Sequence, residues 1–585
     1  MRLFIQSVFI PRGKILYIIR GEDEWEHLEE KRLISSRRAI STLQAVVIIV
    51  IVVAAAVGGY WWYTSTRKPA APEEIVLTVP RGGVVMTLDP AESYSVPTHE
   101  VIVPVYETLL RYDPENTSHL IPWLAESWEV SENGMSYIFH LRQNVTFHDG
   151  TPFNASCVLY SFNRTYSLGL GPSWMMSPIN FSACSIIDTY TVNITLKYPY
   201  APFIYSMAAQ WGPLIVSPTF CKVHATPEDP WAHEYLKEHM CGTGPYMLEE
   251  WVPEDHVTLV KNPNYWRGWS GKHVDKIYMP LIAESSTRRM RLEEGTIDIG
   301  GLNLEDAIAV NGTEGVVVEV VPSLNNLMIF MNTQKPPLNN KLVRQAISYM
   351  FNYTGALETI RHGFGSQARG PLPASLWGWD PDCPQYSMNL TKAQELIEQA
   401  GYAPENITLE VWYVSTSDEE RRCAELLQAA AQQIGVTITP KGVTWSALDS
   451  AMHPGSGNAT DAPDMAMLYW YPDYADPDDY LGQLYYCYND TVPTDTSAYP
   501  WFNYGYYTNA TLNKILEEAA QTNNLTERIK LYRKAQRIIV EDAPAIFVFD
   551  EPAVLTYRSW VKGYYFNPCY VGTIDFYSIH IEGRP

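Results

Sequence analysis

Two adjacent acidic pairs, Glu293/Glu294 and Asp478/Asp479, are the first places in this 585-residue chain to look for acid–base catalysis. Adjacent side chains point in different directions, and neither pair has a histidine or serine partner in a catalytic pattern. The chain also lacks the HExxH, GxSxG and GxxxxGK[ST] motifs of metalloproteases, serine hydrolases and ATPases. The sequence therefore predicts a protein that is not an enzyme and that needs no metal or cofactor.

Cysteine is the second reactive residue type, and its spacing argues against metal binding. No two cysteines form a CxxC or zinc-type cluster, so the sequence favours up to four disulfides in an oxidising compartment. Eight cysteines allow 105 pairings; the local pairs Cys221–Cys241 and Cys383–Cys423 are our prediction. The cysteines are Cys157, Cys184, Cys221, Cys241, Cys383, Cys423, Cys487 and Cys569.

Aromatic residues are abundant, with 18 Trp and 39 Tyr. Sugar faces stack on aromatic rings, so the clusters make an oligosaccharide ligand an open alternative. Core packing is the competing role for any single ring. The clusters are Trp377 with Trp379, 469–471, Tyr485 with Tyr486, and 501–507.

Charge and glycosylation signals describe the surface. Beyond residue 68 the chain carries 32 Lys and Arg against 59 Asp and Glu, a net charge of −27. Such a surface repels nucleic acid, so DNA and RNA are excluded as partners. The same region holds 14 Asn-x-Ser/Thr sites, which predict a glycoprotein exposed outside the cell.

The N-terminal region has the features of a membrane anchor. No charged residue lies between Arg38 and Arg67, and an aromatic group at 60–63 closes the apolar run. About 20 apolar residues span a bilayer, and the basic side of a helix faces the cytoplasm. We expect a cytoplasmic or signal leader over 1–38, a transmembrane anchor over 39–66, a tether over 67–74, and the remainder on the extracellular face of the cell membrane.

The junction at 37–42 (RRAIST) resembles the type IV pilin-like signals of archaeal surface proteins, which implies cleavage near Ala39–Ile40. Ordinary secretion is the alternative, with Ala54–Ala56 as its small-residue cleavage site. An uncleaved anchor is the third possibility.

Strand and helix patterns alternate over the following 500 residues and predict α/β lobes with mixed sheets. The clearest unit covers 391–440. A helix ends at Gly401, the strand LEVWYV follows, a long helix runs from about Ser417 to Gly435, and the strand VTITP completes it.

Ordered sequence blocks carry a family resemblance. They are LDP at 88–90 with VYETLL at 105–110, the stretch 122–158 with LAESW and FHDGTP, and the blocks 242–266, 286–300, 331–349 and 469–481. In this order and spacing they resemble the family 5 extracellular solute-binding proteins of ABC importers, which take oligopeptides, dipeptides, nickel or oligosaccharides. The resemblance covers about 75–570.

The resemblance implies a two-lobed α/β clamshell of the periplasmic-binding-protein type with an extra domain in the first lobe. Domain I is expected over 75–110, 240–324 and 550–585, the extra domain II over 111–239, and domain III over 325–549. The hinge is expected near 323–326 and 549–552.

It also implies a ligand site. In peptide-binding members the aspartate of W-x-x-D-Y anchors the free α-amino group of the peptide, and Asp473 occupies that position. We expect Trp470, Tyr471, Tyr474 and Trp377 around it. The implied function is oligopeptide capture for import with ABC permease subunits and cytoplasmic ATPases. An oligosaccharide-binding subunit and a ligand sensor without transport remain as alternatives.

Overall fold

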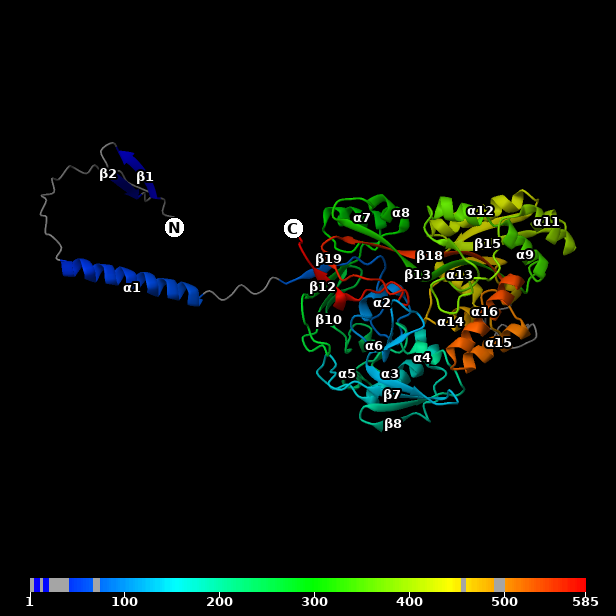
Figure 1. Ribbon diagram of the computed structural model, residues 1–585, viewed down its shortest axis with the longest axis horizontal. Coiled ribbons are helices and arrows are strands. Elements are labelled where there is room, and N and C mark those ends of the chain that lie inside the picture. The colour runs from blue at the N-terminus through cyan, green and yellow to red at the C-terminus, as the bar shows by residue number, and fades with distance from the viewer. Residues whose placement is uncertain (1–4, 11–13, 20–41, 67–73, 454–458, 489–499) are drawn as a thin grey trace. The chain divides into compact units, whose positions relative to one another are not determined.

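A computed structural model describes residues 5–10, 14–19, 42–66, 74–453, 459–488 and 500–585 (Figure 1). Two compact units divide the chain, residues 1–73 and residues 74–585. The first unit contains a hairpin of β1 (Ile5–Ile10) and β2 (Lys14–Ile19), followed by α1 (Thr42–Thr66). The predicted signal junction at 37–41 and most of the tether lie outside the described residues. Within the described part of the chain, no helix combines the length and apolar character that crossing a membrane requires.

The second unit is mixed α/β, as predicted, and begins with a four-stranded sheet. Its order is β10–β11–β12–β3, and only the β12–β3 pair is parallel. The first strand of the unit thus joins a sheet whose other strands begin about 170 residues later in the sequence. The strands are β3 (Val76–Thr78), β10 (Tyr246–Val252), β11 (His256–Lys261) and β12 (Lys276–Pro280), and the helices near them in sequence are α2 (Val96–Ile102), α7 (Ser285–Glu294) and α8 (Leu304–Val310).

A second four-stranded sheet, entirely antiparallel, has the order β6–β7–β9–β8. The Asn154 side chain caps its main helix α3 by accepting from the Ser156 N–H, and Gly169 ends that helix in the left-handed conformation. The elements of this part are β4 (Leu110–Tyr112), β5 (Leu120–Pro122), β6 (Ala125–Val130), β7 (Ser136–Leu141), α3 (Ala155–Leu168), β8 (Ser185–Asp188), β9 (Thr191–Thr195), α4 (Phe203–Ser206), α5 (Pro218–His224) and α6 (His233–Leu236).

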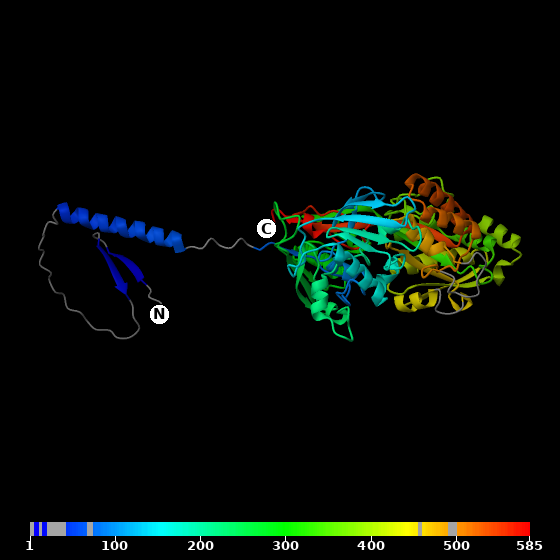
Figure 2. The ribbon, with the colours of Figure 1, turned by 90° about the horizontal axis from the view of Figure 1, so that it is seen from below.

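A six-stranded mixed sheet of order β14–β18–β13–β17–β15–β16 organises the rest. Figure 1 shows helices on both faces, and Figure 2 shows α15 and α16, in orange, side by side. The elements are β13 (Val316–Met331), α9 (Lys341–Met350), α10 (Tyr353–Gly355), β14 (Ser366–Gln367), α11 (Leu390–Gln399), β15 (Thr408–Val414), α12 (Asp418–Gln432), β16 (Thr437–Val443), α13 (Trp445–Met452), β17 (Met465–Trp470), α14 (Pro477–Tyr485), α15 (Ala510–Gln521), α16 (Leu525–Asp542) and β18 (Ala545–Arg558), after which β19 (Val561–Lys562) pairs with β20 (His580–Ile581).

The predicted unit over 391–440 is confirmed by α11, β15, α12 and β16. Ser417 caps α12 by accepting from the Glu420 N–H, and Gly401 and Gly435 have the positive φ angles expected after helix ends. Strands β15 and β16 pair in parallel, with Leu409 opposite Ile438. Local sequence signals were sufficient here because the helix cap, the two glycines and the β15–β16 pair all lie within this short segment.

Side chains alternate between two cores across the six-stranded sheet. Leu327 and Ile329 of β13 enter the core with α9, α11 and α12, whereas Met328 and Phe330 enter the core with α14, α15 and α16. This alternation is the two-residue period of a strand buried on both faces.

These separate cores explain why the predicted Cys383–Cys423 disulfide is wrong. Cys221, Cys241, Cys383 and Cys423 are free thiols. Cys383 packs in the core with α14 to α16, whereas Cys423 packs in the core on the opposite face of the sheet. Cys221 and Cys241, in contrast, lie near each other, because the Ser217 N–H donates to the Cys241 carbonyl and the Cys221 N–H donates to the Ser217 carbonyl, both at 3.1 Å. The sheet therefore separates Cys383 from Cys423, whereas Cys221 and Cys241 are neighbouring free thiols.

The long strands β13 and β18 cross the unit side by side (Figure 1). Their antiparallel register runs from Val316 opposite Arg558 to Phe330 opposite Ala545, and it shifts between Val321 and Asn325. Ser323 donates through its hydroxyl to the Glu551 carbonyl at this irregularity. The shift falls in the segments 323–326 and 549–552, where the sequence predicts a hinge.

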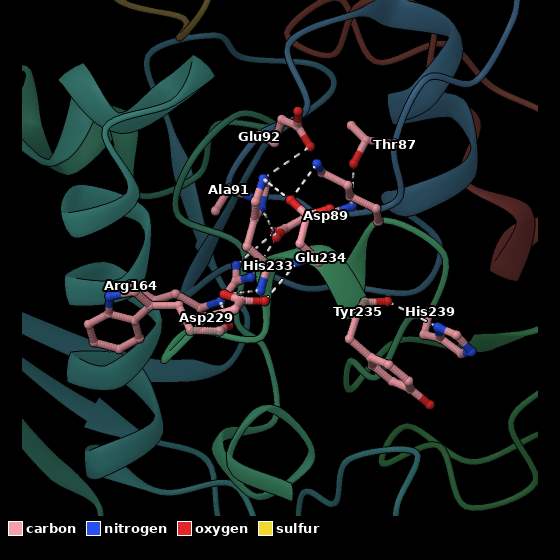
Figure 3. A network of polar contacts seen from close by, with 12 residues as sticks. Thr87, Asp89, Ala91, Glu92, Arg164, Asp229, His233, Glu234, Tyr235 and His239 are labelled. Carbon is pink, nitrogen blue, oxygen red and sulfur yellow. Dashed lines mark hydrogen bonds and ion pairs between the residues drawn. The ribbon is translucent and has the colours of Figure 1, made fainter. Parts of the chain in front are cut away.

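A buried polar network fixes the chain segment that leads to the cavity described below (Figure 3). Both oxygens of Asp89 accept from the Arg164 guanidinium, at 2.7 and 2.5 Å, and His233 Nδ1 lies 3.0 Å from Asp89 Oδ2. Arg164 belongs to α3 and His233 to α6, so the network joins three distant segments. It holds the segment that continues to Tyr94.

Candidate ligand-binding site

A cavity of about 1070 Å³ lies between two groups of segments in the second unit. The first wall consists of Tyr94 and lining residues from 169–206. The second wall consists of lining residues from 445–453, 474–488 and 500–521. Its volume lies just above the roughly 300–1,000 Å³ found for small-molecule sites. The cavity therefore has room for a ligand larger than a single amino acid.

Aromatic residues supply eleven of the 28 lining residues. Trp445, Tyr488 and Trp501 are 52%, 68% and 60% exposed, so they present open ring faces. Such rings bind apolar and cationic groups without requiring one ligand shape. The aromatic lining residues are Tyr94, Trp174, Tyr198, Tyr200, Trp445, Tyr474, Tyr486, Tyr488, Trp501, Phe502 and Tyr504.

Local backbone features place the first wall. Gly171 has φ of +34°, and a Cβ there would lie 2.5 Å from the Glu92 carbonyl oxygen. Only glycine allows this close approach, which brings the 3₁₀ turn Gly171–Met176 against the segment before Tyr94. Trp174 in this turn consequently lines the cavity together with Tyr94.

The start of α14 places the second wall. Asp476 is its N-cap and accepts from the Asp478 N–H at 2.9 Å, and Pro477 occupies the first helical position. The Arg528 guanidinium lies 2.8 Å from the buried Asp476 carboxylate. This arrangement holds Tyr474 and Asp478 at the cavity surface.

Hydroxyl groups from both walls converge on Asp478. Its Oδ2 accepts from Tyr200 at 2.6 Å and from Tyr474 at 2.8 Å, and the two tyrosine oxygens are 3.0 Å apart. Burial raises the pKa of Asp478, while the two hydroxyl donors lower it. The carboxylate thereby connects the two walls.

Asp473 lies one layer behind the cavity surface and is 8% exposed. Burial raises its pKa to about 7, although a hydrogen bond with the cavity residue Tyr94 lowers it. Its backbone N–H donates to Asp479 Oδ2 at 3.1 Å, and Trp470 Nε1 donates to the same oxygen at 3.0 Å. Burial, followed by the neighbouring Asp473 charge, raises the pKa of Asp479 well above its usual range.

The two buried carboxyls have no cationic partner within the part of the chain that the structure describes. An ammonium group that reached Asp473 would replace lost hydration with a charge-assisted hydrogen bond. The arrangement is therefore suited to binding a ligand cation.

The structure places one of the five predicted site residues, Tyr474, in the cavity lining. Asp473 lies behind Tyr94. Trp470 is buried against Phe502, with ring centroids 5.2 Å apart, and serves to hold Asp479. Tyr471 is 42% exposed and stacks on Tyr469 outside the cavity lining.

Trp377 is the fifth predicted residue, and it also lies outside the lining of this cavity. Its Nε1 donates to the Ala475 carbonyl at 3.0 Å, and the Arg528 guanidinium lies 5.1 Å from its ring centroid. Trp377 therefore supports the chain behind the second wall.

Sequence reasoning missed most of the cavity lining. The cluster at 501–507 and Tyr486 carried an aromatic signal, and Trp501, Phe502 and Tyr504 do line the cavity. Trp174, Asp449, His453 and Glu517 carried no motif. The described residues contain no group of three His, Cys, Asp or Glu that could hold a metal ion.

Comparisons with known proteins give consistent matches. A model of the bacterial extracellular solute-binding proteins, family 5, middle region, matches residues 119–492. "Probable D,D-dipeptide-binding periplasmic protein DdpA" of Escherichia coli K12 is 30% identical over 504 residues, which cover 85% of this chain and 93% of that protein. "Heme-binding protein A" of Haemophilus influenzae is 29% identical over 502 residues, covering 82% of this chain and 87% of that protein.

A solved structure is similar over the same extent. The ABC transporter-associated periplasmic binding protein DppA from Helicobacter pylori, in complex with the peptide STSA, has a TM-score of 0.73 and 29% identity. It covers 87% of this chain and 98% of the solved chain. The likeness thus extends over nearly complete proteins and is not confined to one motif.

Proposed function

This chain belongs to the family 5 extracellular solute-binding proteins, and on this premise we propose that it captures short peptides for import by an ABC transporter. Members of this family bind solutes and do not catalyse reactions. The cavity supports the proposal, because it is large enough for a short peptide and lies between two walls that can enclose a ligand.

The observation that carries the peptide assignment is the buried Asp473 next to the cavity residue Tyr94, for which the described residues supply no cationic partner. A peptide N-terminus supplies the cation that this carboxylate lacks. The relative from Helicobacter pylori was solved with the peptide STSA, and this chain is 29% identical to it.

We further propose that domains I and III move about the β13–β18 crossing, with domain II as the extra domain, over the ranges predicted from sequence. The register shift between Val321 and Asn325 supports a hinge there, since an irregular strand pair yields more easily than a regular ladder. In this proposal closure presents the liganded protein to permease subunits, and ATPases on the cytoplasmic side supply the energy.

We also propose that the segment before residue 74 anchors the receptor in the membrane. The apolar interval between Arg38 and Arg67, with more basic residues before it than after it, motivates the proposal. The anchor would keep the receptor on the extracellular face near its permease.

A neutral oligosaccharide is the second candidate ligand, because eleven aromatic residues line the cavity and sugar faces stack on aromatic rings. Titration calorimetry with a short peptide, its N-acetylated form and a neutral oligosaccharide separates the two. We expect the free peptide to bind and the acetylated peptide to bind at least 30-fold more weakly. This is the effect of losing about 2 kcal/mol or more from a desolvated charge pair. Tight binding of the oligosaccharide alone would overturn the peptide assignment.

A further inference from the structure

The lining of the cavity is acidic, and among the described residues it contains no lysine or arginine. Asp449, Asp478 and Glu517 all lie on the second wall. The lining chemistry therefore offers several anionic groups and no permanent cation.

We propose that this cavity selects peptides with a positively charged side chain and leaves the peptide's C-terminal carboxylate without a counter-charge. The inference rests on the proposed peptide-binding function and specifies which peptides that site takes. It concerns the second wall, and it is separate from the role of Asp473 at the peptide N-terminus.

Asp449 and Glu517 are the carboxylates with spare capacity to bind a ligand. Asp449 Oδ1 lies 2.8 Å from His453 Nε2, and Glu517 Oε1 accepts from the Tyr486 hydroxyl at 2.7 Å. Each carboxylate can accept about four hydrogen bonds, so oxygen lone pairs remain for a ligand cation. Asp478, in contrast, is buried and already accepts from two hydroxyls.

Two cations close to the walls have other partners, and the exposed Lys514 of α15 lies outside the lining. The Lys197 ammonium donates to the Ser177 carbonyl at 2.7 Å and lies 5.3 Å from the Tyr166 ring centroid. Arg528 is buried and pairs with Asp476. A ligand carboxylate in the cavity would thus meet like charge without compensation, whereas a ligand ammonium or guanidinium would be attracted.

The exposed rings strengthen this preference. Cations bind favourably over the faces of tryptophan and tyrosine. Trp445 and Trp501 are both more than half exposed and belong to the same wall as Asp449 and Glu517. A lysine or arginine side chain can place its methylene groups on a ring and its charge near a carboxylate.

Titration calorimetry on the wild-type protein tests the inference with four tetrapeptides. The probes are Ala-Phe-Lys-Ala as the free acid, the same peptide as the C-terminal amide, Ala-Phe-Leu-Ala and Ala-Phe-Glu-Ala. We expect the lysine peptide to bind about 10-fold tighter than the leucine peptide and the glutamate peptide to be the weakest. The amide should bind at least as tightly as the acid.

Variants locate the effect. Asp449→Asn with Glu517→Gln should reduce the lysine-to-leucine affinity ratio by about 5-fold or more. The matched control Glu518→Gln, on the same helix as Glu517 but outside the lining, should leave that ratio unchanged. Thermal unfolding checks that each variant is folded.

The outcomes separate this inference from the function on which it rests. Equal or stronger binding of the glutamate peptide, or a 10-fold loss on amidation, would overturn the charge preference while peptide binding stands. If none of the four peptides binds, the proposed peptide function fails and this inference fails with it.

Discussion

The Tyr200 hydroxyl donates a hydrogen bond of 2.6 Å to Asp478 Oδ2, and this contact joins the two walls of the cavity. The two residues are 278 positions apart in sequence. Tyr474 donates to the same oxygen from the second wall, so one carboxylate organises hydroxyls from both sides. The bond therefore favours the arrangement in which the walls face each other closely.

Replacement of Tyr200 by phenylalanine should weaken this connection. Tyr200→Phe removes a donor to a buried carboxylate, and a hydrogen bond to a charged group contributes about 1.5–3 kcal/mol. We expect the free energy of unfolding, measured by urea denaturation, to fall by about that amount. Tyr198→Phe is the control, because Tyr198 lies in the same segment and is half exposed. Equal effects of the two changes would contradict a specific role for the Tyr200–Asp478 bond.

The network around Asp89 predicts a pH dependence of stability. The hydrogen bond with Asp89 raises the pKa of His233, so the folded protein binds the proton more tightly than the unfolded chain does. The resulting stabilisation is fully present below the unfolded pKa of about 6.5 and is lost as the pH rises through the higher folded value.

His233→Gln should therefore cost more stability at pH 6 than at pH 8.5. Urea denaturation of the wild type and the variant at both pH values measures this difference. His239→Gln is the control, because His239 is exposed and its Nδ1 contacts the Tyr235 carbonyl. A cost of His233→Gln that does not change with pH would show that the network acts through packing alone.

The sequence was sufficient where structure is local. The unit over 391–440 was predicted correctly because its helix period, its capping Ser417 and its two glycines all lie within the segment. The mixed α/β class followed from the alternation of such units. The Cys383–Cys423 prediction failed because the two residues lie on opposite faces of one sheet, a relationship that no local pattern encodes.

The site could be predicted only in part for the same reason. A motif identified Tyr474 and Asp473, which lie at or directly behind the cavity surface. Trp174 and Tyr200 reach the cavity from the first wall only after the chain has folded over nearly 300 residues. Trp377 and Tyr471 were expected around Asp473, but Trp377 is buried behind the second wall and Tyr471 stacks on Tyr469, so neither lines the cavity.

The proposed anchor has a direct test at the N-terminus of the mature protein. N-terminal sequencing of membrane fractions should give an end near Ile40 if the pilin-like signal is processed. A variant starting at residue 67 should be released as a soluble receptor that retains ligand binding. A mature end just beyond Ala56, with the protein in the soluble fraction, would instead mean ordinary secretion.

Asp473→Asn is the sharpest test of the ligand anchor. The substitution is nearly isosteric and removes the charge that we pair with the peptide N-terminus. Loss of one partner from a desolvated charge pair costs about 2–5 kcal/mol, so peptide affinity should fall by roughly 30-fold or more. The N-acetylated peptide, which already lacks the charge, should bind the wild type and the variant about equally. An unchanged affinity for the free peptide would remove Asp473 from the site.

The raised pKa of Asp473 adds a pH dependence of ligand binding. In the unliganded protein burial raises that pKa to about 7, so a peptide ammonium must displace a proton at lower pH. Affinity for a peptide with a neutral side chain should therefore fall by roughly an order of magnitude between pH 7.5 and pH 5.5, as the protonated fraction rises. Over this range the peptide N-terminus remains largely protonated, since its pKa is about 8.

Calorimetry measures both the affinity and the protons exchanged with the buffer. In the wild type, peptide binding should release a proton from the protein to the buffer. In Asp473→Asn, the affinity should not change with pH. A wild-type affinity that is constant from pH 7.5 to 5.5 would mean that the ligand cation does not bind at Asp473.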